Sequence, residues 1–533
     1  MRREGPVILS ILLAAVFAFS VAGHADELSD LQAKQLREQN QALTKRVADL
    51  ERRQQKLEKK STAQAQPAMA NRSLSDAMAA DLPYKTAQKA PAPASDDLCW
   101  NGVCLYGTIE MGLTYQNHGA PLSPLSGSAL DYMITKTSNG SYFGVAPNAI
   151  TNSNIGLRGK QEIADGLYAV FNLQTMFNAE NGTILSGIGA VAQNSGLPLA
   201  QQNAAGDSSK AGQAFNNAAY AGLSSPTYGT LTFGRQSTLV SDAVSNYDPI
   251  PGSNAFSVIG FQGLTGGGGD TENRTFDNSF EYRVNVGPVR LAAETQLRNG
   301  GNSGTGNAFQ GSVGFDYMGV SFDALGSKIN DAVSAAPLSA AQVATLQASD
   351  LPQGLGAVAA TVSDNTAFML VARYTIGPIE LYGGYEHINF ANPKNPLSAG
   401  AWLEGGYTIG APNNTNFTTD KIFQVFWVGA KYSVKPDLDL TVAYYHQKQN
   451  SFVIGNGTNP TGTCDTAVSA GCGGTLDAVS LVADYRFARH FDAYAGIMWS
   501  QAQNGLISGF LLATPGVKKL SDYDPTVGLR YQF

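Results

Sequence analysis

Charged and polar side chains alternate with apolar ones in many stretches from Leu98 to the end of this chain. In the last stretch the apolar residues from Val527 to Phe533 share one side of an extended chain, whereas Gly528, Arg530 and Gln532 share the other. The same parity assigns further polar side chains to that second face: Arg283, Arg290, Glu294, Gln296, Arg298, Arg373, Lys431, Asp484 and Arg486. Unpaired charges are too costly in a dry interior. The face must therefore be wet, and its chemistry is to attract or repel passing ions.

Catalytic motifs are missing from the sequence. It contains no G-x-S-x-G and no H-E-x-x-H, and it has only five histidines. An enzyme is one rival class of function, and these absences argue against it. We expect no enzymatic activity and no cofactor or metal.

Strands of about ten residues must position the two faces. The period-two pattern predicts about sixteen antiparallel strands, the first over 105–115. The others are expected at roughly 154–162, 166–178, 216–224, 229–237, 275–286, 288–299, 307–317, 319–328, 365–376, 378–389, 421–432, 437–449, 476–487, 490–501 and 523–533.

The connections between these strands alternate between tight turns and long loops. Short turns are expected at 164–166, 286–288, 317–319 and 376–378, and the long loops are rich in Gly, Asn and Ser. Short periplasmic turns opposite long outer loops are typical of all-β transmembrane barrels. A soluble β-sandwich is the alternative, but it needs no polar interior. A barrel of about sixteen strands is wide enough for an aqueous channel.

The composition agrees with such a barrel. Charged residues make up 14% of the chain, and mean hydropathy is −0.12. The only long apolar run lies within the first 25 residues, which excludes a helical membrane protein. The whole chain has a net charge of −7. We therefore expect no nucleic-acid partner.

Three segments precede the barrel, which is predicted over 98–533. Residues 1–25 resemble a Sec signal peptide cleaved after Ala25, with an uncleaved anchor helix as the alternative. Residues 26–60 place leucines seven residues apart, which predicts a short periplasmic coiled coil; a single solvated helix is the alternative. Residues 61–97 are rich in Ala, Pro and Gln and predict a flexible linker.

Four cysteines form two close pairs, Cys99 with Cys104 and Cys464 with Cys472. Four thiols allow three connectivities. In a barrel the first pair lies at the periplasmic start of the first strand and the second pair in an outer loop. We therefore expect two local disulfides rather than cross-pairing or a four-thiolate zinc site.

Four stretches resemble the general diffusion porins of Gram-negative bacteria. They are 105–116 (LYGTIEMGLTYQ), 154–178 (NIGLRGKQEIADGLYAVFNLQTMFN), 220–236 (YAGLSSPTYGTLTFGRQ) and 527–533 (VGLRYQF). The resemblance covers the barrel and not the coiled coil. It implies a homotrimer in the outer-membrane lipid, and it implies that Phe533 is read by the outer-membrane assembly machinery.

The resemblance also implies a pore constriction, because the family folds its third outer loop inward against wall arginines. The segment 241–251 (SDAVSNYDPIP) resembles that loop and makes Asp248 a pore-facing acid, while Gly252 occupies the family's other acidic position. On the wall, Arg235 and Arg274 match arginine positions, and Arg158 lies in the matching second strand. Arg283 joins this set by parity. Arg235 shares the parity of lipid-facing neighbours, so it reaches the lumen only if its strand bends.

These features predict an outer-membrane porin that passes small hydrophilic solutes and ions, with a weak preference for anions. Two alternatives stay open. Aromatic residues of the third loop (Tyr247, Phe256 and Phe261) could line a substrate-specific channel, or could only pack the loop to the wall. The coiled coil could tether the barrel to peptidoglycan or another periplasmic partner.

Overall fold

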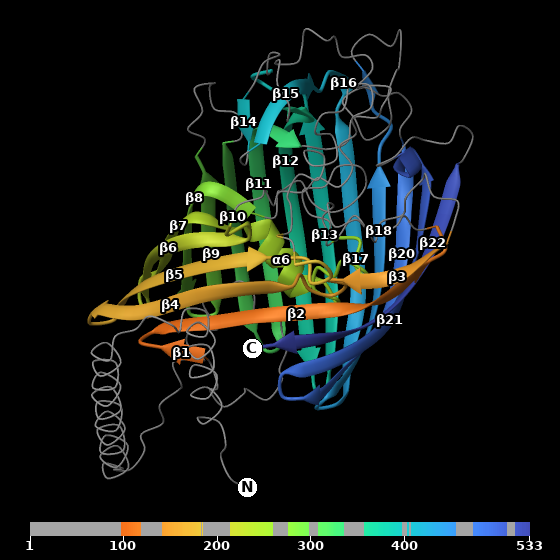
Figure 1. Ribbon diagram of the computed structural model, residues 1–533. Helices are drawn as coiled ribbons and strands as arrows, with labels where there is room; N and C mark the ends of the chain where they lie inside the picture. The colour runs from red at the N-terminus through yellow and green to blue at the C-terminus, as the bar shows by residue number, and fades with distance from the viewer. Residues whose placement is uncertain are drawn as a thin grey trace, which may run out of the picture. The chain divides into compact units, whose positions relative to one another are not determined.

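A computed structural model describes residues 98–118, 141–182, 184, 214–259, 275–297, 307–334, 357–396, 402–404, 407–454, 473–508 and 518–533. Within these ranges sixteen strands form one antiparallel barrel (Figure 1). They are β2 (Val103–Gln116), β4 (Asn154–Ala164), β5 (Leu167–Met176), β6 (Ala218–Ser225), β7 (Gly229–Ser237), β8 (Thr275–Val286), β9 (Val289–Gln296), β10 (Ala308–Tyr317), β11 (Val320–Ser334), β12 (Ala357–Ile376), β13 (Ile379–Ala391), β17 (Lys421–Lys435), β18 (Leu438–Gln449), β20 (Gly474–Ala488), β21 (Phe491–Asn504) and β22 (Lys519–Gln532).

The first and last of these strands close the barrel. Residues Thr108–Thr114 of β2 pair with Thr526–Gln532 of β22, and the start of β2 pairs with β4. The terminal Phe533 extends this seam, because its backbone exchanges hydrogen bonds of 2.9 and 3.0 Å with Gly107. The predicted closed barrel of sixteen strands is confirmed.

Tight turns lie at one end of the barrel, as predicted. Gly166, Gly287 and Gly377 have φ of 66°, 60° and 57°. Met318 and Gly319 adopt φ of 48° and 81° in the fourth turn. Glycine accepts this left-handed backbone without steric cost, which explains why these short sequences reverse the chain.

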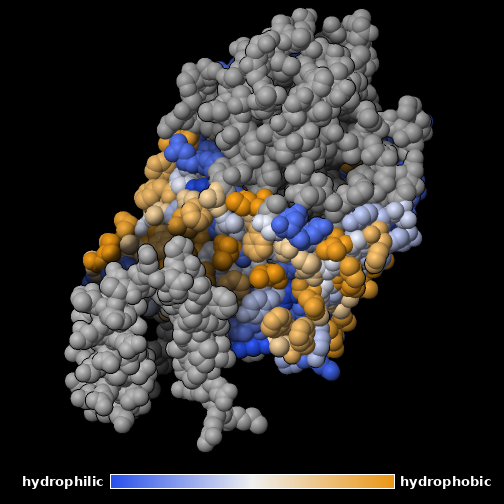
Figure 2. Space-filling model, viewed as in Figure 1, coloured by the Kyte–Doolittle hydropathy of each residue, from blue (hydrophilic) through white to orange (hydrophobic). Residues whose placement is uncertain are grey.

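The outer face of the barrel is apolar. Val527 and Leu529 of β22 are 48% and 56% exposed, whereas Arg530, the residue after Leu529, is only 3% exposed and faces inward. Figure 2 shows apolar side chains over much of the barrel wall on the visible face. Lipid covers such a face in a membrane, and the parity prediction for the last strand is confirmed.

Shorter elements complete the described part of the chain. β1 (Leu98–Trp100) forms a hairpin with β2 that the predicted Cys99–Cys104 disulfide closes. β3 (Tyr142–Pro147) pairs with the second half of β2, and β15 (Tyr407–Asn414) pairs with β12 and with β14 (Trp402–Glu404). β16 (Phe417–Thr419) pairs with β19 (Val453–Ile454). The helical elements are α6 (Leu239–Tyr247) and the short 3-10 helix η3 (Gly505–Ser508).

No helix in the described ranges is long and apolar enough to cross a membrane.

Several predictions fall outside the described residues. These are the signal peptide (1–25), the coiled coil (26–60), the linker (61–97), Phe261, Arg274, Arg298 and the Cys464–Cys472 pair. They remain predictions.

Candidate functional site: a constriction inside the barrel

The chain turns into the barrel directly after β7 (Figure 1). Thr238 caps α6, because its side chain accepts a hydrogen bond from the backbone N–H of Ser241. The first backbone N–H groups of a helix have no partner within it. The wall supplies acceptors for two of them: Glu294 accepts from Leu239 at 3.3 Å and Gln310 accepts from Val240 at 3.2 Å. We call residues 238–259 the constriction loop.

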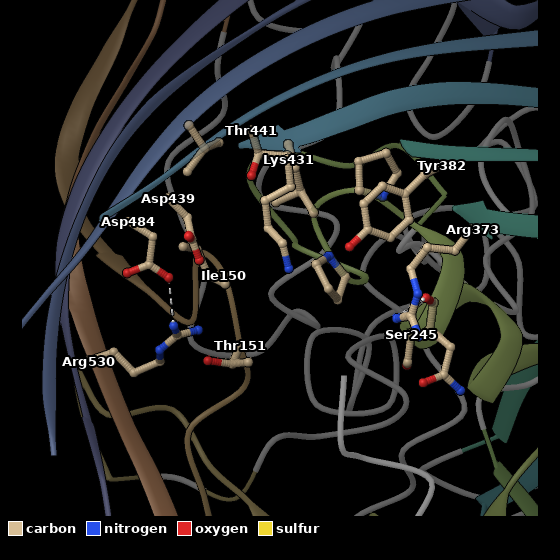
Figure 3. A pocket seen from close by; sticks show the side chains of 15 residues that line it. Ile150, Thr151, Ser245, Arg373, Tyr382, Lys431, Asp439, Thr441, Asp484 and Arg530 are labelled. Atoms are coloured by element: carbon tan, nitrogen blue, oxygen red, sulfur yellow. Dashed lines mark hydrogen bonds and ion pairs between the residues drawn. The ribbon is translucent and has the colours of Figure 1, made fainter. Parts of the chain in front are cut away.

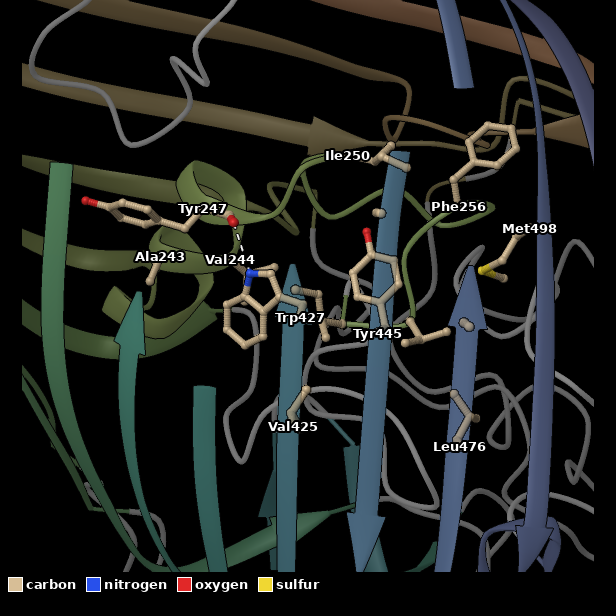
Figure 4. Close-up of a cluster of buried hydrophobic side chains, with 14 of the residues drawn as sticks. Ala243, Val244, Tyr247, Ile250, Phe256, Val425, Trp427, Tyr445, Leu476 and Met498 are labelled. Atoms are coloured by element: carbon tan, nitrogen blue, oxygen red, sulfur yellow. Dashed lines mark hydrogen bonds between the residues drawn. The ribbon is translucent and has the colours of Figure 1, made fainter. Parts of the chain in front are cut away.

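Apolar packing holds the constriction loop against the inside of the wall (Figure 4). Trp427 is 1% exposed, and its indole N–H donates to the backbone oxygen of Tyr247 at 3.0 Å. Phe256 is fully buried and meets Tyr494 edge-on, with 6.3 Å between ring centroids. Tyr247 is only 2% exposed. Tyr247 and Phe256 therefore pack the loop to the wall and do not line the lumen.

Asp248 lies in the middle of this loop and points to the wall. Its carboxylate is fully buried and accepts hydrogen bonds from the Tyr445 hydroxyl at 2.6 Å and the Ser257 hydroxyl at 2.5 Å. Backbone N–H groups of Ile250 and Gly252 donate to it at 3.2 and 2.9 Å. Burial raises the pKa of Asp248 to about 6. The carboxylate organises the loop instead of presenting its charge to the lumen.

An open cavity of about 820 Å³ lies between the constriction loop and the wall (Figure 3). The lining residues of the constriction loop are apolar or uncharged, and strands β12, β17, β18, β20 and β22 of the wall contribute all the charged lining side chains. The lining residues are Ile150, Thr151, Ser245, Asn246, Pro249, Ile250, Pro251, Arg373, Tyr382, Lys431, Asp439, Thr441, Val482, Asp484 and Arg530. The lining includes three cations and two carboxylates, so its net charge is +1.

The three lining cations differ in how far carboxylates neutralise them. Lys431 is 2.5 Å from a carboxylate oxygen of Glu380. Arg530 pairs with Asp492 at 2.7 Å and with Asp484 at 3.1 Å.

Arg373 has no ion pair with any described residue, and its guanidinium donates to the backbone oxygen of Asn246 at 3.5 Å. Arg373 is therefore the lining cation whose charge is least compensated.

The three predicted arginines that the structure describes, Arg158, Arg235 and Arg283, lie apart from this cavity. Arg158 is on the lumen face of β4, with its guanidinium 5.1 Å from the centre of the Tyr106 ring. Arg235 sits where the β7–β8 register shifts; it is 7% exposed and pairs with Asp277 at 2.5 Å.

Arg283 bonds to Asp242 of α6 and pairs with Glu281 at 2.5 Å, so it anchors the constriction loop. Neither Arg283 nor Arg158 nor Arg235 lines the cavity.

The sequence did not single out the cations that do line the cavity. Parity places Arg373, Lys431 and Arg530 on the lumen face, where the structure has them. Parity carries no information about where the constriction loop lands along the wall. The distance of a lumen-facing cation from the nearest tight turn is a signal that could have found two of them. Arg373 and Lys431 both lie a few residues from the end of their strand where a short turn follows.

Comparisons with known proteins agree with this architecture. A family model described as Gram-negative porin matches residues 62–505. An outer membrane porin of Bordetella pertussis is 30% identical over 147 residues, which are 28% of this chain and 31% of that protein. The chain thus spans less than a third of that relative's length. The solved structure of an anion-selective porin from Comamonas acidovorans has a TM-score of 0.52 at 15% identity, covering 81% of this chain and 99% of that one.

Proposed function

Because the chain belongs to the Gram-negative porin family, we propose that it forms a water-filled channel in the outer membrane, through which small hydrophilic solutes and ions diffuse passively. The wet lumen supports this proposal, since the wall carries charged side chains such as Arg373 and Lys431 around an open cavity of about 820 Å³. Diffusion through such a lumen needs neither an energy source nor a binding site that changes conformation.

The channel is proposed to prefer anions weakly. The observation that carries this is Arg373, which faces the cavity without an ion pair to any described carboxylate. Asp248, the acid of the constriction loop, is fully buried against Tyr445 and adds no exposed carboxylate on the opposite side. A fixed charge in a narrow aqueous neck raises the local concentration of counter-ions. The uncompensated guanidinium should therefore favour anions.

Single-channel recording in planar bilayers tests both statements. The purified protein should conduct in steps, and its reversal potential in a KCl gradient should show a modest excess of chloride permeability. An absence of conductance would contradict the channel itself, and a clear cation preference would contradict the selectivity. Liposome swelling with sugars and organic anions separates a general channel, which responds to solute size, from a specific one, which saturates.

The partners of the barrel are also proposals. A homotrimer is expected from the family, and its mass can be measured in detergent by light scattering. Recognition of Phe533 by the assembly machinery is supported by its place at the closing seam opposite Gly107. Deleting Phe533 should lower the amount of heat-modifiable barrel in the outer membrane; an unchanged amount would argue against this role.

Residues 26–60 are proposed to form a periplasmic coiled coil that tethers the barrel to peptidoglycan or another envelope partner. Deleting residues 26–97 should leave conductance intact and weaken trimer stability or envelope attachment. A loss of conductance in this deletion would show that tether and pore are not separate.

A further inference from the structure

The strand beside β2 is interrupted between β3 and β4, and the residues of the interruption turn into the lumen. β3 pairs with β2 from Met111 onward, and β4 pairs with β2 up to Thr108. Two residues of β2, Ile109 and Glu110, thus stand opposite residues 148–153, which we call the inward segment. Its buried backbone groups lose their sheet partners and must be paired in another way.

The Glu110 side chain provides that pairing. One carboxylate oxygen accepts the backbone N–H of Ile150 at 2.5 Å. The other accepts the backbone N–H of Thr151 at 2.7 Å and its hydroxyl at 2.6 Å. Ser153 adds a second link, because its hydroxyl accepts from the Glu110 N–H at 3.0 Å. Glu110 is fully buried, so these groups replace water for a charged acceptor.

The inward segment forms one side of the constriction. Ile150 and Thr151 line the cavity, on the side where Arg530 lies (Figure 3). The far end of the constriction loop docks on the same segment. The Ala255 N–H and the Ser253 hydroxyl donate to the backbone oxygen of Ala149 at 2.8 and 2.9 Å.

A second contact joins the constriction loop to Asn148, the residue before Ala149. The Asn254 side chain donates to the backbone oxygen of Asn148 at 2.6 Å. The constriction loop is therefore held at both ends: α6 bonds to β9 and β10, and residues 253–255 bond to the inward segment.

Glu110 also stands opposite Arg530 in the β2–β22 register. Arg530 is 3% exposed and is oriented by Asp492 and Asp484. The positive charge of Arg530 attracts the Glu110 carboxylate across this strand pair. One residue thus adjoins both the backbone that narrows the lumen and a charge that lines it.

We propose that Glu110 is a positioning residue for the constriction: its carboxylate holds residues 148–153 in the lumen, where they narrow the channel and receive the end of the constriction loop. The inference rests on the proposed channel function. It assigns a role to a wall residue that touches neither the cavity nor the passing solute.

The test is Glu110→Gln in the full-length protein. A glutamine has only one acceptor oxygen, so it can accept hydrogen bonds from Ile150 or from Thr151 but not from both. Its NH₂ group would face the remaining N–H or O–H donor. The inward segment should relax toward the wall. Single-channel conductance should rise, the solute size limit in liposome swelling should increase, and open-channel current noise should grow.

The matched control is Glu386→Gln, because Glu386 is a 2% exposed glutamate of β13 that does not line the cavity. It should leave conductance and size limit as in the wild type. Equal changes in both variants would overturn the proposal, because they would report only the loss of one buried charge. So would a folded Glu110→Gln channel with wild-type conductance and size limit.

If Glu110→Gln does not assemble, Ser153→Ala decides the question. Ser153 is fully buried, does not line the cavity, and touches the Glu110 backbone. Its removal should raise current noise and conductance to a smaller extent, and an unchanged channel would overturn the proposal. Wild-type protein without conductance would instead contradict the channel function, so the two failures are distinguishable.

Discussion

The Tyr445 hydroxyl of β18 donates a 2.6 Å hydrogen bond to the Asp248 carboxylate, and both side chains are fully buried. This bond joins the barrel wall to the middle of the constriction loop. The acid that sequence resemblance places in the pore is thus used to fasten the loop. The same bond leaves the loop side of the cavity without an exposed carboxylate from Asp248.

Tyr445→Phe should loosen the constriction loop. The substitution keeps the ring and removes one donor from a buried carboxylate, which costs about 1–3 kcal/mol. We expect larger open-channel current noise and a lower urea midpoint of unfolding. Tyr444→Phe is the control, because Tyr444 is 42% exposed on the outer face and bonds to Asp477 instead. Equal noise in the two variants would argue against the role of the Asp248 bond.

Attachment of the constriction loop should weaken as pH rises. Asp248 lies on this loop, outside the barrel strands, and burial raises its pKa from 3.8 to about 6. The attached loop therefore holds the proton more tightly than a detached one. Its stabilisation is fully present below pH 4 and is lost as pH rises through 6, by at most about 3 kcal/mol.

Current noise recorded between pH 4 and pH 8 measures this effect. Noise should grow toward neutral pH in the wild type and should vary less with pH in Asp248→Asn. An identical pH dependence in the variant would assign the effect to another group.

Arg373→Gln should reduce the preference for anions. The substitution removes the lining cation that has no ion pair with a described residue, so the reversal potential in a KCl gradient should shift toward cation permeability. Arg235→Gln is the matched control, since Arg235 pairs with Asp277 and does not line the cavity. A shift of the same size in both variants would contradict the assignment.

Gly429→Ala should narrow the channel. Gly429 lies in β17 under the constriction loop, and an added methyl group would meet the ring of Pro249 and the backbone oxygen of Val442. The loop must then move into the lumen, and conductance should fall. Gly383→Ala is the control, because its added methyl group would meet nothing closer than 3.8 Å. Unchanged conductance in Gly429→Ala would show that the wall yields instead of the loop.

The sequence by itself determined the barrel, because strand formation depends on local pattern. Alternation along β22 put Arg530 inside and Leu529 outside, and the structure agrees. The glycines at 166, 287 and 377 marked tight turns because each supplies a positive φ. The close spacing of Cys99 and Cys104, together with their place at the start of the first predicted strand, predicted the disulfide that the structure has.

The tertiary structure alone decided which charges meet in the lumen. Arg373 lines the cavity and Arg235 does not, because the constriction loop lands on the wall where Trp427 and Tyr445 offer apolar contacts. Asp248 turns away from the lumen because Tyr445, 197 residues later, donates to it. Such relationships join residues distant in sequence, and no local period encodes them. Periodicity therefore assigns a side chain to a face, and only packing assigns it to a site.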